Sequence, residues 1–292
     1  TTGAATPSPA QAQVTTAASD LRTRPLSDPE SAPVTEHGLL HAVATDVGRS
    51  RQINQDSALA LALNLETFET SPVMGVFIVA DGMGGHHDGE QASAIAVRTI
   101  ASDILDTLIL PQIGSTSSDE PTPGRVMSIM SDAMNQANQA VQLNAPNSGT
   151  TATVAVVIGS KLHITHVGDS RAYLVTPEGI EALTRDHSLV KRLQELGQLS
   201  EEDLEHHPQR NVLYRAIGQG DSLEVDENSR YLPPGSRLVL CSDGLWGVLG
   251  DTRLGQLARV PDLRAACRGL IQEANDRGGP DNITVVIVQA PE

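Results

Sequence analysis

The chain of 292 residues is poor in aromatic residues and cysteine. Phe, Tyr and Trp together make up 2% of the residues, and the two cysteines are Cys241 and Cys267. With so few rings, the core must be packed from Ala, Val, Leu and Ile, which the hydrophobic fraction of 39% supplies. Neither cysteine has a second one nearby, whereas disulfide frameworks and thiolate metal sites need closer or more numerous partners. We expect both to be buried, reduced thiols.

Long apolar runs and an excess of basic charge are also missing. No stretch approaches the ~18 to 20 apolar residues that span a bilayer, and no charged-then-apolar leader opens the chain. These features favour a cytoplasmic protein without a membrane segment, although a fragment of a longer membrane-anchored protein would look identical. Asp and Glu outnumber Lys and Arg by 36 to 20, for a formal charge of −16. Such a surface disfavours nucleic acid or an anionic membrane as the main partner. Part of this negative charge could be offset by bound divalent metal. Alternatively, the acidic residues only aid solubility.

The composition divides the chain near residue 36. Residues 1–36 are rich in Ala, Thr, Ser, Pro and Gln and show no periodic apolar face, which predicts a flexible tail or linker. An ordered domain is expected over residues 37–292. It opens with strands near Leu39 and over Val73–Ala80.

Two amphipathic helices are expected next, because apolar residues recur at helical spacing. The first runs from Glu90 to Leu108 and the second begins at Arg125, with a polar Pro/Gly/Ser loop between them. Their predicted buried faces consist of Ala92, Ala96, Ile100, Ile104 and Leu108 in the first helix, and Val126, Met130, Met134, Ala137 and Val141 in the second.

Strands dominate the second half of the chain. Short turns separate the first three, which favours antiparallel meander connections over βαβ crossovers. A polar, acidic and helical insertion at about 186–212 interrupts the strands and is a candidate flap over a site. The predicted fold is α+β: a central antiparallel β-sandwich whose outer faces are covered by pairs of helices, in four layers αββα. The expected strands are Thr151–Ile158, Leu162–Val167, Arg171–Val175, Arg237–Cys241 and Ile283–Gln289.

Four aspartates stand at the ends of apolar, strand-like runs, spread over the whole chain. They are Asp81, Asp169, Asp243 and Asp281. An isolated buried charge costs many kcal/mol, so carboxylates placed in this way need a partner. The repeated placement predicts one shared site for a hard divalent cation, which prefers oxygen ligands.

The segment DGMGG, which begins with Asp81, allows two interpretations when taken alone. Glycines permit close approach of the backbone to a ligand, so that Asp81 bridges two metals while Gly82 offers its carbonyl. The alternative is a glycine-rich turn capped locally by the aspartate. The further carboxylates in SDGL and GPDNIT favour a two-metal centre that generates hydroxide for attack on phosphorus.

Eight segments between Leu39 and Gln289 resemble, in order and spacing, the metal-dependent Ser/Thr protein phosphatases of the type-2C (PPM) family, in its bacterial branch. The segments are TDVGRSRQINQDS, VADGMGGHHDGE, SGTTATVAVV, HVGDSRAYLV, LTRDHSLV, YRAIGQG, LCSDGLWGVL and GGPDNITVVIV. The resemblance implies hydrolysis of phosphoserine and phosphothreonine in proteins by direct attack of a metal-bridging hydroxide. It also implies Mn²⁺ or Mg²⁺ as cofactor, with two core ions and a third.

The resemblance assigns the metal ligands residue by residue. Asp81 would bridge both core metals, Gly82 would bind one of them through its carbonyl, and Asp243 and Asp281 would complete the ligands of the second metal. Asp56 would hold metal-bound water from further out.

Further roles follow from the same resemblance. Asp169, together with Asp243, would bind the third ion. Arg51 stands where the family places its phosphate-binding arginine, and a guanidinium fork suits two phosphate oxygens; the alternative is an exposed surface arginine.

One position departs from the eukaryotic members, which carry a histidine two residues after the bridging aspartate. Here that residue is Met83, and His86 matches the histidine of bacterial members. His86 could protonate the leaving alkoxide. Alternatively, it is a loop histidine that tunes metal-bound water or only forms hydrogen bonds.

Two other functions compete with catalysis. A non-catalytic relative would keep the fold and bind phosphoproteins or scaffold a kinase, but such proteins lose metal carboxylates that are all present here. A structural calcium protein would need the alternating acidic spacing of an EF-hand, which is absent. The expected partners are phosphorylated proteins, including Ser/Thr kinases and their substrates, and the expected state is a monomer.

Overall fold

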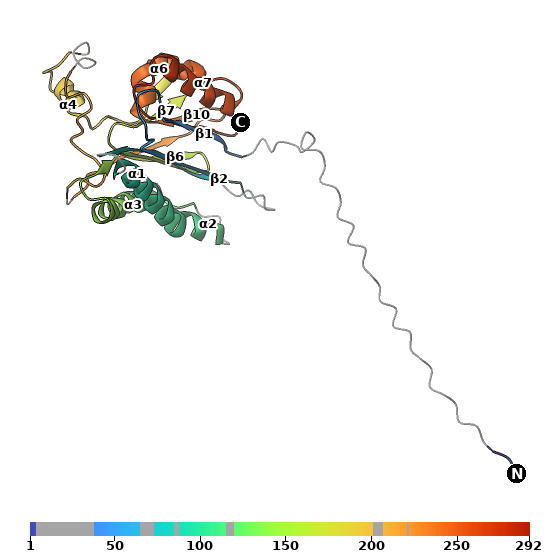
Figure 1. Cartoon of the computed structure of the whole chain (residues 1–292). Helices are drawn as coiled ribbons and strands as arrows, with labels where there is room; N and C mark the ends of the chain where they lie inside the picture. Colours follow the sequence, from blue (N-terminus) through green and yellow to red (C-terminus); the bar gives the residue numbers. More distant parts are fainter. Residues whose placement is uncertain (4–37, 65–72, 85–87, 115–119, 201–206, 221) are drawn as a thin grey trace. The chain divides into compact units, whose positions relative to one another are not determined.

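The computed structural model describes residues 1–3, 38–64, 73–84, 88–114, 120–200, 207–220 and 222–292 (Figure 1). Contacts group Glu36–Glu292 into one compact unit. Within the described residues, no helix is both long enough and apolar enough to cross a membrane. Cys241 and Cys267 are free and buried, as predicted.

Two antiparallel sheets form the centre of this unit. The first has the order β1-β11-β10-β7-β8, with β1 Leu40–Asp46, β11 Ile283–Gln289, β10 Arg237–Cys241, β7 Arg171–Val175 and β8 Ile180–Ala182. The second has the order β2-β3-β5-β6-β9, with β2 Asp56–Leu63, β3 Met74–Met83, β5 Ala152–Ile158, β6 Lys161–Val167 and β9 Asp226–Tyr231. The short strand β4, Gly149–Thr150, pairs with the end of β3.

The central strands are apolar on both faces because each sheet is covered on both sides. β5 and β10 are buried along their whole length, and β3 is buried from Met74 to Ala80. A strand buried on both faces reads as a continuous apolar run, without the alternation of a half-exposed strand.

Helices cover the two outer faces. On the β3/β5 sheet lie α1 (Asp88–Ile104), the π-helical turn η1 (Leu105–Ile109), α2 (Leu110–Gly114) and α3 (Pro123–Asn144). On the other sheet lie α6 (Asp243–Ala258) and α7 (Leu263–Asp276), as Figure 1 shows. Both predicted helical faces are buried against the sheet, with every one of their ten residues at most 2% exposed.

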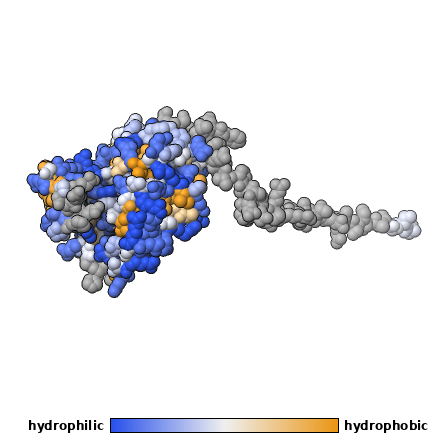
Figure 2. Space-filling view, turned by 90° about the horizontal axis from the view of Figure 1, so that it is seen from above, coloured by the Kyte–Doolittle hydropathy of each residue, from blue (hydrophilic) through white to orange (hydrophobic). Residues whose placement is uncertain are grey.

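Three apolar clusters follow from this layering. One lies between α1, α3 and their sheet, one between α6, α7 and theirs, and the third between the two sheets. The predicted four-layer αββα sandwich is confirmed. On the face shown in Figure 2, hydrophilic residues predominate and apolar ones occur in small, separate patches.

Some details differ from the expectations. The strands β2, β8 and β9 were not predicted. The strands β6 and β7 do not form a meander, because the turn between them carries the chain from one sheet to the other. In the insertion at about 186–212, helix is confined to α4, Leu189–Glu195, among the described residues; residues 201–206 lie outside them.

Candidate metal centre

Strand pairing brings the first two carboxylates together. Asp56 opens β2 and stands directly opposite Asp81 in β3. The backbone of Asp81 is fixed by the two residues that precede β5: its N–H donates to Thr151 Oγ1 (2.8 Å), and its carbonyl accepts from Thr150 Oγ1 and the Thr151 N–H (both 2.9 Å). The two threonines therefore position Asp81.

Gly82 follows in a place that no side chain can share. A Cβ atom at this position would lie 2.0 Å from the carbonyl oxygen of Gly89 and 2.7 Å from that of Gln55. The Gly82 N–H donates to the same Gln55 carbonyl at 3.1 Å. The start of α1 thus packs directly on the backbone beside Asp81, which only glycine permits.

Asp243 is held at the beginning of α6, immediately after β10. This places its carboxylate in the first turn of the helix, where the helix dipole favours negative charge. The preceding Ser242 donates its hydroxyl to Asp56 Oδ2 (2.7 Å) and accepts the N–H of Thr284 (3.0 Å). One hydroxyl therefore connects β10, β11 and β2 at the level of the carboxylates.

Asp281 precedes β11 and contacts Arg51. The Arg51 Nη2 atom donates to Asp281 Oδ2 at 2.7 Å, with the arginine side chain 48% exposed. Asn282 secures the loop that carries Arg51: its Nδ2 donates to the carbonyls of Val47 (3.0 Å) and Ile53 (2.9 Å). Asn282 therefore orients this loop.

Asp169 lies in the turn that carries the chain between the sheets. Its side chain is buried, and its backbone carbonyl accepts the indole N–H of Trp246 at 2.9 Å. The Arg171 guanidinium carbon stacks 3.4 Å from the centroid of the same indole ring. The preceding Gly168 has a φ of +110°, a conformation that glycine adopts without strain.

The carboxylates influence one another strongly. Burial, followed by the charges of Asp56 and Asp243, raises the pKa of Asp81 well above its usual range. Burial also raises the pKa of Asp56 to about 7, against hydrogen bonds from Thr284 and Ser242 that lower it. Burial and the charge of Asp281 raise the pKa of Asp243 to about 6. Burial, Asp243 and Asp186 raise the pKa of Asp169.

This cluster fits a divalent cation by its unpaired oxygens. Asp56 Oδ1 and Asp243 Oδ1 are buried and have no hydrogen-bond partner in the described part of the chain. A buried carboxylate oxygen without a donor is unfavourable unless a cation approaches it. The side chains are neighbours, however, and do not form a closed shell: within the described ranges, no three His, Cys, Asp or Glu side chains stand together as a ready-made site. The carboxylate of Asp281, by contrast, is partnered by its ion pair with Arg51.

The structure thus brings together most of the predicted site. Asp56, Asp81, Asp243 and Asp281 interact directly or through their charges, and Asp169 faces the same group. His86, the predicted proton donor, lies outside the described residues. Ser242 was not among the predicted residues, although it stands inside the SDGL motif, where a hydroxyl next to a metal carboxylate is a usable signal.

Comparison with known proteins decides the family. The model of the family described as protein phosphatase 2C matches residues 44–204. The chain belongs to this family. The protein phosphatase 2C resemblance seen in the motifs is therefore confirmed, and with it the prediction of a metal-dependent enzyme that dephosphorylates serine and threonine residues in proteins.

Individual relatives agree with this assignment. The chain is 36% identical over 248 residues to the serine/threonine phosphatase stp of Listeria monocytogenes, covering 84% of this chain and 93% of that protein. It superposes on the S. agalactiae serine/threonine phosphatase with a TM-score of 0.74 at 31% identity, covering 86% and 99% of the two chains. The catalytic domain of the phosphatase PstP, solved with two manganese ions, gives a TM-score of 0.68 at 26% identity, covering 86% and 98%.

Proposed function

We propose that Asp81, Asp243, Asp281 and the carbonyl of Gly82 hold two divalent cations, Mn²⁺ or Mg²⁺, at the ends of β3, β10 and β11. The unpaired Oδ1 atoms of Asp56 and Asp243 and the raised pKa values of the buried carboxylates support this assignment. Asp56, on the edge strand β2 opposite Asp81, would hold metal-bound water, and Asp169 with Asp243 would hold a third ion.

When bound, the ions would lower the pKa of water at the site and neutralise charge on the phosphate. The chain contributes the remaining parts. Arg51, whose guanidinium is half exposed at the edge of the cluster, binds two phosphate oxygens of the substrate in place of Asp281. Ser242 and the two threonines that precede β5 keep Asp56 and Asp81 in position. His86 supplies the proton to the leaving serine or threonine oxygen.

The broader setting is proposed on the same basis. The substrates are phosphorylated proteins, among them Ser/Thr kinases and the proteins these modify, and the enzyme acts as a monomer in the cytoplasm. The catalytic domain spans residues 37–292 with a flap at about 186–212, and residues 1–36 form a tail or linker.

Removal and return of metal test the proposal. Treatment with EDTA should abolish phosphate release from a phosphothreonine peptide, and added Mn²⁺ should restore it. Asp81→Asn should lower the rate by at least about 100-fold, because even outer-shell changes at metal sites cost 10- to 100-fold. Asp132→Asn, an exposed position on α3, is the matched control and should behave like wild type. Full activity in EDTA would refute the proposal.

A further inference from the structure

A cavity of about 660 Å³ opens beside the metal centre, between α4 and residues 214–226. Its size lies in the range of pockets that bind small molecules or side chains. Two of its lining residues reach toward the carboxylate cluster. His187 Nδ1 accepts the N–H of Gly168 (3.1 Å), next to Asp169, and Gln219 Nε2 contacts Met83 Sδ (3.7 Å), two residues after Asp81. A peptide with its phosphorylated residue at the metal centre can therefore place a neighbouring side chain in this cavity.

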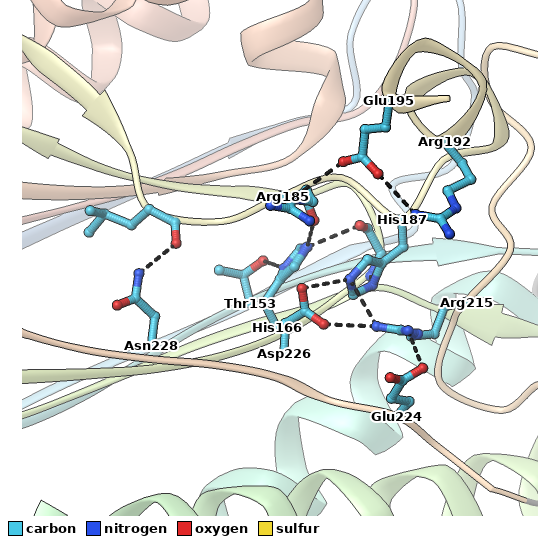
Figure 3. Close-up of polar contacts among 12 residues, drawn as sticks. Thr153, His166, Arg185, His187, Arg192, Glu195, Arg215, Glu224, Asp226 and Asn228 are labelled. Carbon is cyan, nitrogen blue, oxygen red and sulfur yellow. Dashed lines mark hydrogen bonds and ion pairs between the residues drawn. The ribbon is translucent and has the colours of Figure 1, made fainter. Parts of the chain in front are cut away.

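The α4 side of the cavity carries an excess of positive charge. Arg185 and Arg192 share one carboxylate, that of Glu195, at 3.4 and 3.3 Å (Figure 3). The two arginine side chains are 68% and 57% exposed, whereas Glu195 is 27% exposed. One of the two positive charges is thus left without a full counter-charge, on a chain whose formal net charge is −16.

On the opposite side of the cavity, negative charges outnumber positive ones, and the charged groups are paired with one another. Arg215 bonds to both Asp226 (Nη1 to Oδ1, 2.8 Å) and Glu224, and its side chain is 18% exposed. His187 lies between the two sides, with its Nε2 3.2 Å from Asp226 Oδ2 (Figure 3). Because Arg215 already pairs with two carboxylates, the cationic groups left for an incoming anion among the described lining residues lie on the α4 side.

We propose that this cavity is a specificity subsite for an acidic group of the phosphoprotein substrate, a carboxylate or a second phosphate, bound by Arg185 and Arg192. The inference rests on the proposed phosphatase function and names a preference in its substrates. A guanidinium pair offers forked donors that fit either anion. Displacing Glu195 costs little, because ion pairs of exposed arginines such as Arg185 and Arg192 contribute little to stability.

Binding of two matched peptides tests the subsite. Both carry a non-hydrolysable phosphonate in place of the phosphate on threonine, and they differ only in glutamate or glutamine on either side of it. Fluorescence anisotropy in the presence of Mn²⁺ gives the Kd of each. The wild-type protein should bind the glutamate peptide more tightly, despite its own net negative charge. Arg192→Ala should raise the Kd of this peptide roughly 3- to 5-fold, as expected for one exposed charge pair, and leave the glutamine peptide unchanged.

The decisive variant is Glu195→Gln, because it separates recognition from a structural role. Removing this carboxylate frees both arginines, so the Kd for the glutamate peptide should fall, opposite to the effect of Arg192→Ala. If Glu195 only stabilised α4, both variants would weaken binding. Arg277→Ala removes an exposed arginine that pairs with Glu273 on α7, and controls for net charge. Equal affinity of the wild type for both peptides, or weaker binding by Glu195→Gln, would overturn the subsite.

Hydrolysis of p-nitrophenyl phosphate, run in parallel, reports on the proposed function alone. This substrate has no side chain to place in the cavity, so all three variants should keep wild-type turnover. If neither the wild type nor any variant hydrolysed this substrate, while peptide binding still depended on charge as described, the phosphatase assignment would be refuted and the subsite would stand.

Discussion

At the scale of single residues, the site depends on hydroxyl groups as well as carboxylates. Asp56 is buried beside like charges, and burial raises its pKa to about 7. Ser242 is one of the few groups that favour its charged form, through the 2.7 Å hydrogen bond to Oδ2. Because the same hydroxyl accepts the Thr284 N–H, its orientation is fixed and it can donate only to Asp56.

Replacing this hydroxyl should weaken metal binding without touching a proposed metal ligand. For Ser242→Ala we expect the affinity for Mn²⁺ to fall 10- to 100-fold, as is typical when an outer-shell partner of a ligand is lost. Isothermal titration calorimetry measures this change. Ser131→Ala, which removes a hydroxyl bonded to Glu227 on the surface, is the control and should bind Mn²⁺ like wild type. An unchanged affinity in Ser242→Ala would show that Asp56 takes no part in the centre.

Much of the site could be predicted at this scale, and the reason is chemical. Aspartates beside buried strands carry their own signal, because buried charge needs partners, whereas Arg51 was assigned by the family resemblance. Hydroxyl and amide groups carry no such signal. Thr151 and Asn282 act through bonds to the backbone of residues 70 and 229 to 235 positions away, and these contacts exist only after folding.

At the scale of elements, one arginine fixes the base of the insertion. Arg171 at the start of β7 binds Asp186 through two hydrogen bonds (2.9 and 2.7 Å) and stacks on Trp246 of α6. Its side chain is 19% exposed and that of Asp186 is 7% exposed. Hydrogen bonds with Asp186, against the opposing effect of burial, raise the pKa of Arg171 above its usual value, so Arg171 stays charged.

Breaking this pair should be costly, because the remaining charge is buried without a partner. We expect Arg171→Ala to lower the free energy of unfolding by about 3 kcal/mol. Chemical denaturation followed by circular dichroism measures this loss. Arg230→Ala, which removes an exposed pair with Glu181, should change stability by less than about 1 kcal/mol. Similar small effects of both variants would show that Arg171 does not anchor the insertion.

The elements themselves were predictable where periodicity is strong. The faces of α1 and α3 follow directly from apolar spacing, and β10 and β11 match their predicted bounds. The strand β2 was missed because DSALALAL contains four alanines or serines, which have low strand propensity, and its pairing with β3 decides its conformation. Neither propensity nor turn length reveals that the Gly168 turn changes sheets.

At the scale of the whole molecule, the junction of the two sheets contains a buried histidine. His166, at the end of β6, is 1% exposed and contacts Thr153 Oγ1 (3.0 Å) and the carbonyls of Gly168 and Arg185 (3.0 and 3.1 Å). Burial lowers its pKa from 6.5 to about 4, helped by the charge of His187 and opposed by Asp186 and Asp226.

The stability of the fold should therefore depend on pH through His166. Between about pH 6.5 and 4 the unfolded chain binds a proton at this residue and the folded one does not, so stability falls as the pH decreases. From pH 8 to pH 5 the loss amounts to about 2 kcal/mol. Urea unfolding of the wild type and of His166→Gln at both pH values gives the free energy of unfolding. The wild type should lose more of it between pH 8 and pH 5 than the variant does. Identical pH dependence of the two proteins would contradict a neutral, buried His166.

Anomalous diffraction from crystals grown with Mn²⁺ shows whether the strand-end carboxylates form one divalent metal centre. We predict two adjacent manganese peaks that both contact Asp81, with Asp243 and Asp281 completing one of them and a third peak at Asp169. Asp169→Asn should remove the third peak only. Manganese bound without Asp81, or no peak at these carboxylates in crystals of active enzyme, would show that the strand-end carboxylates do not form this centre.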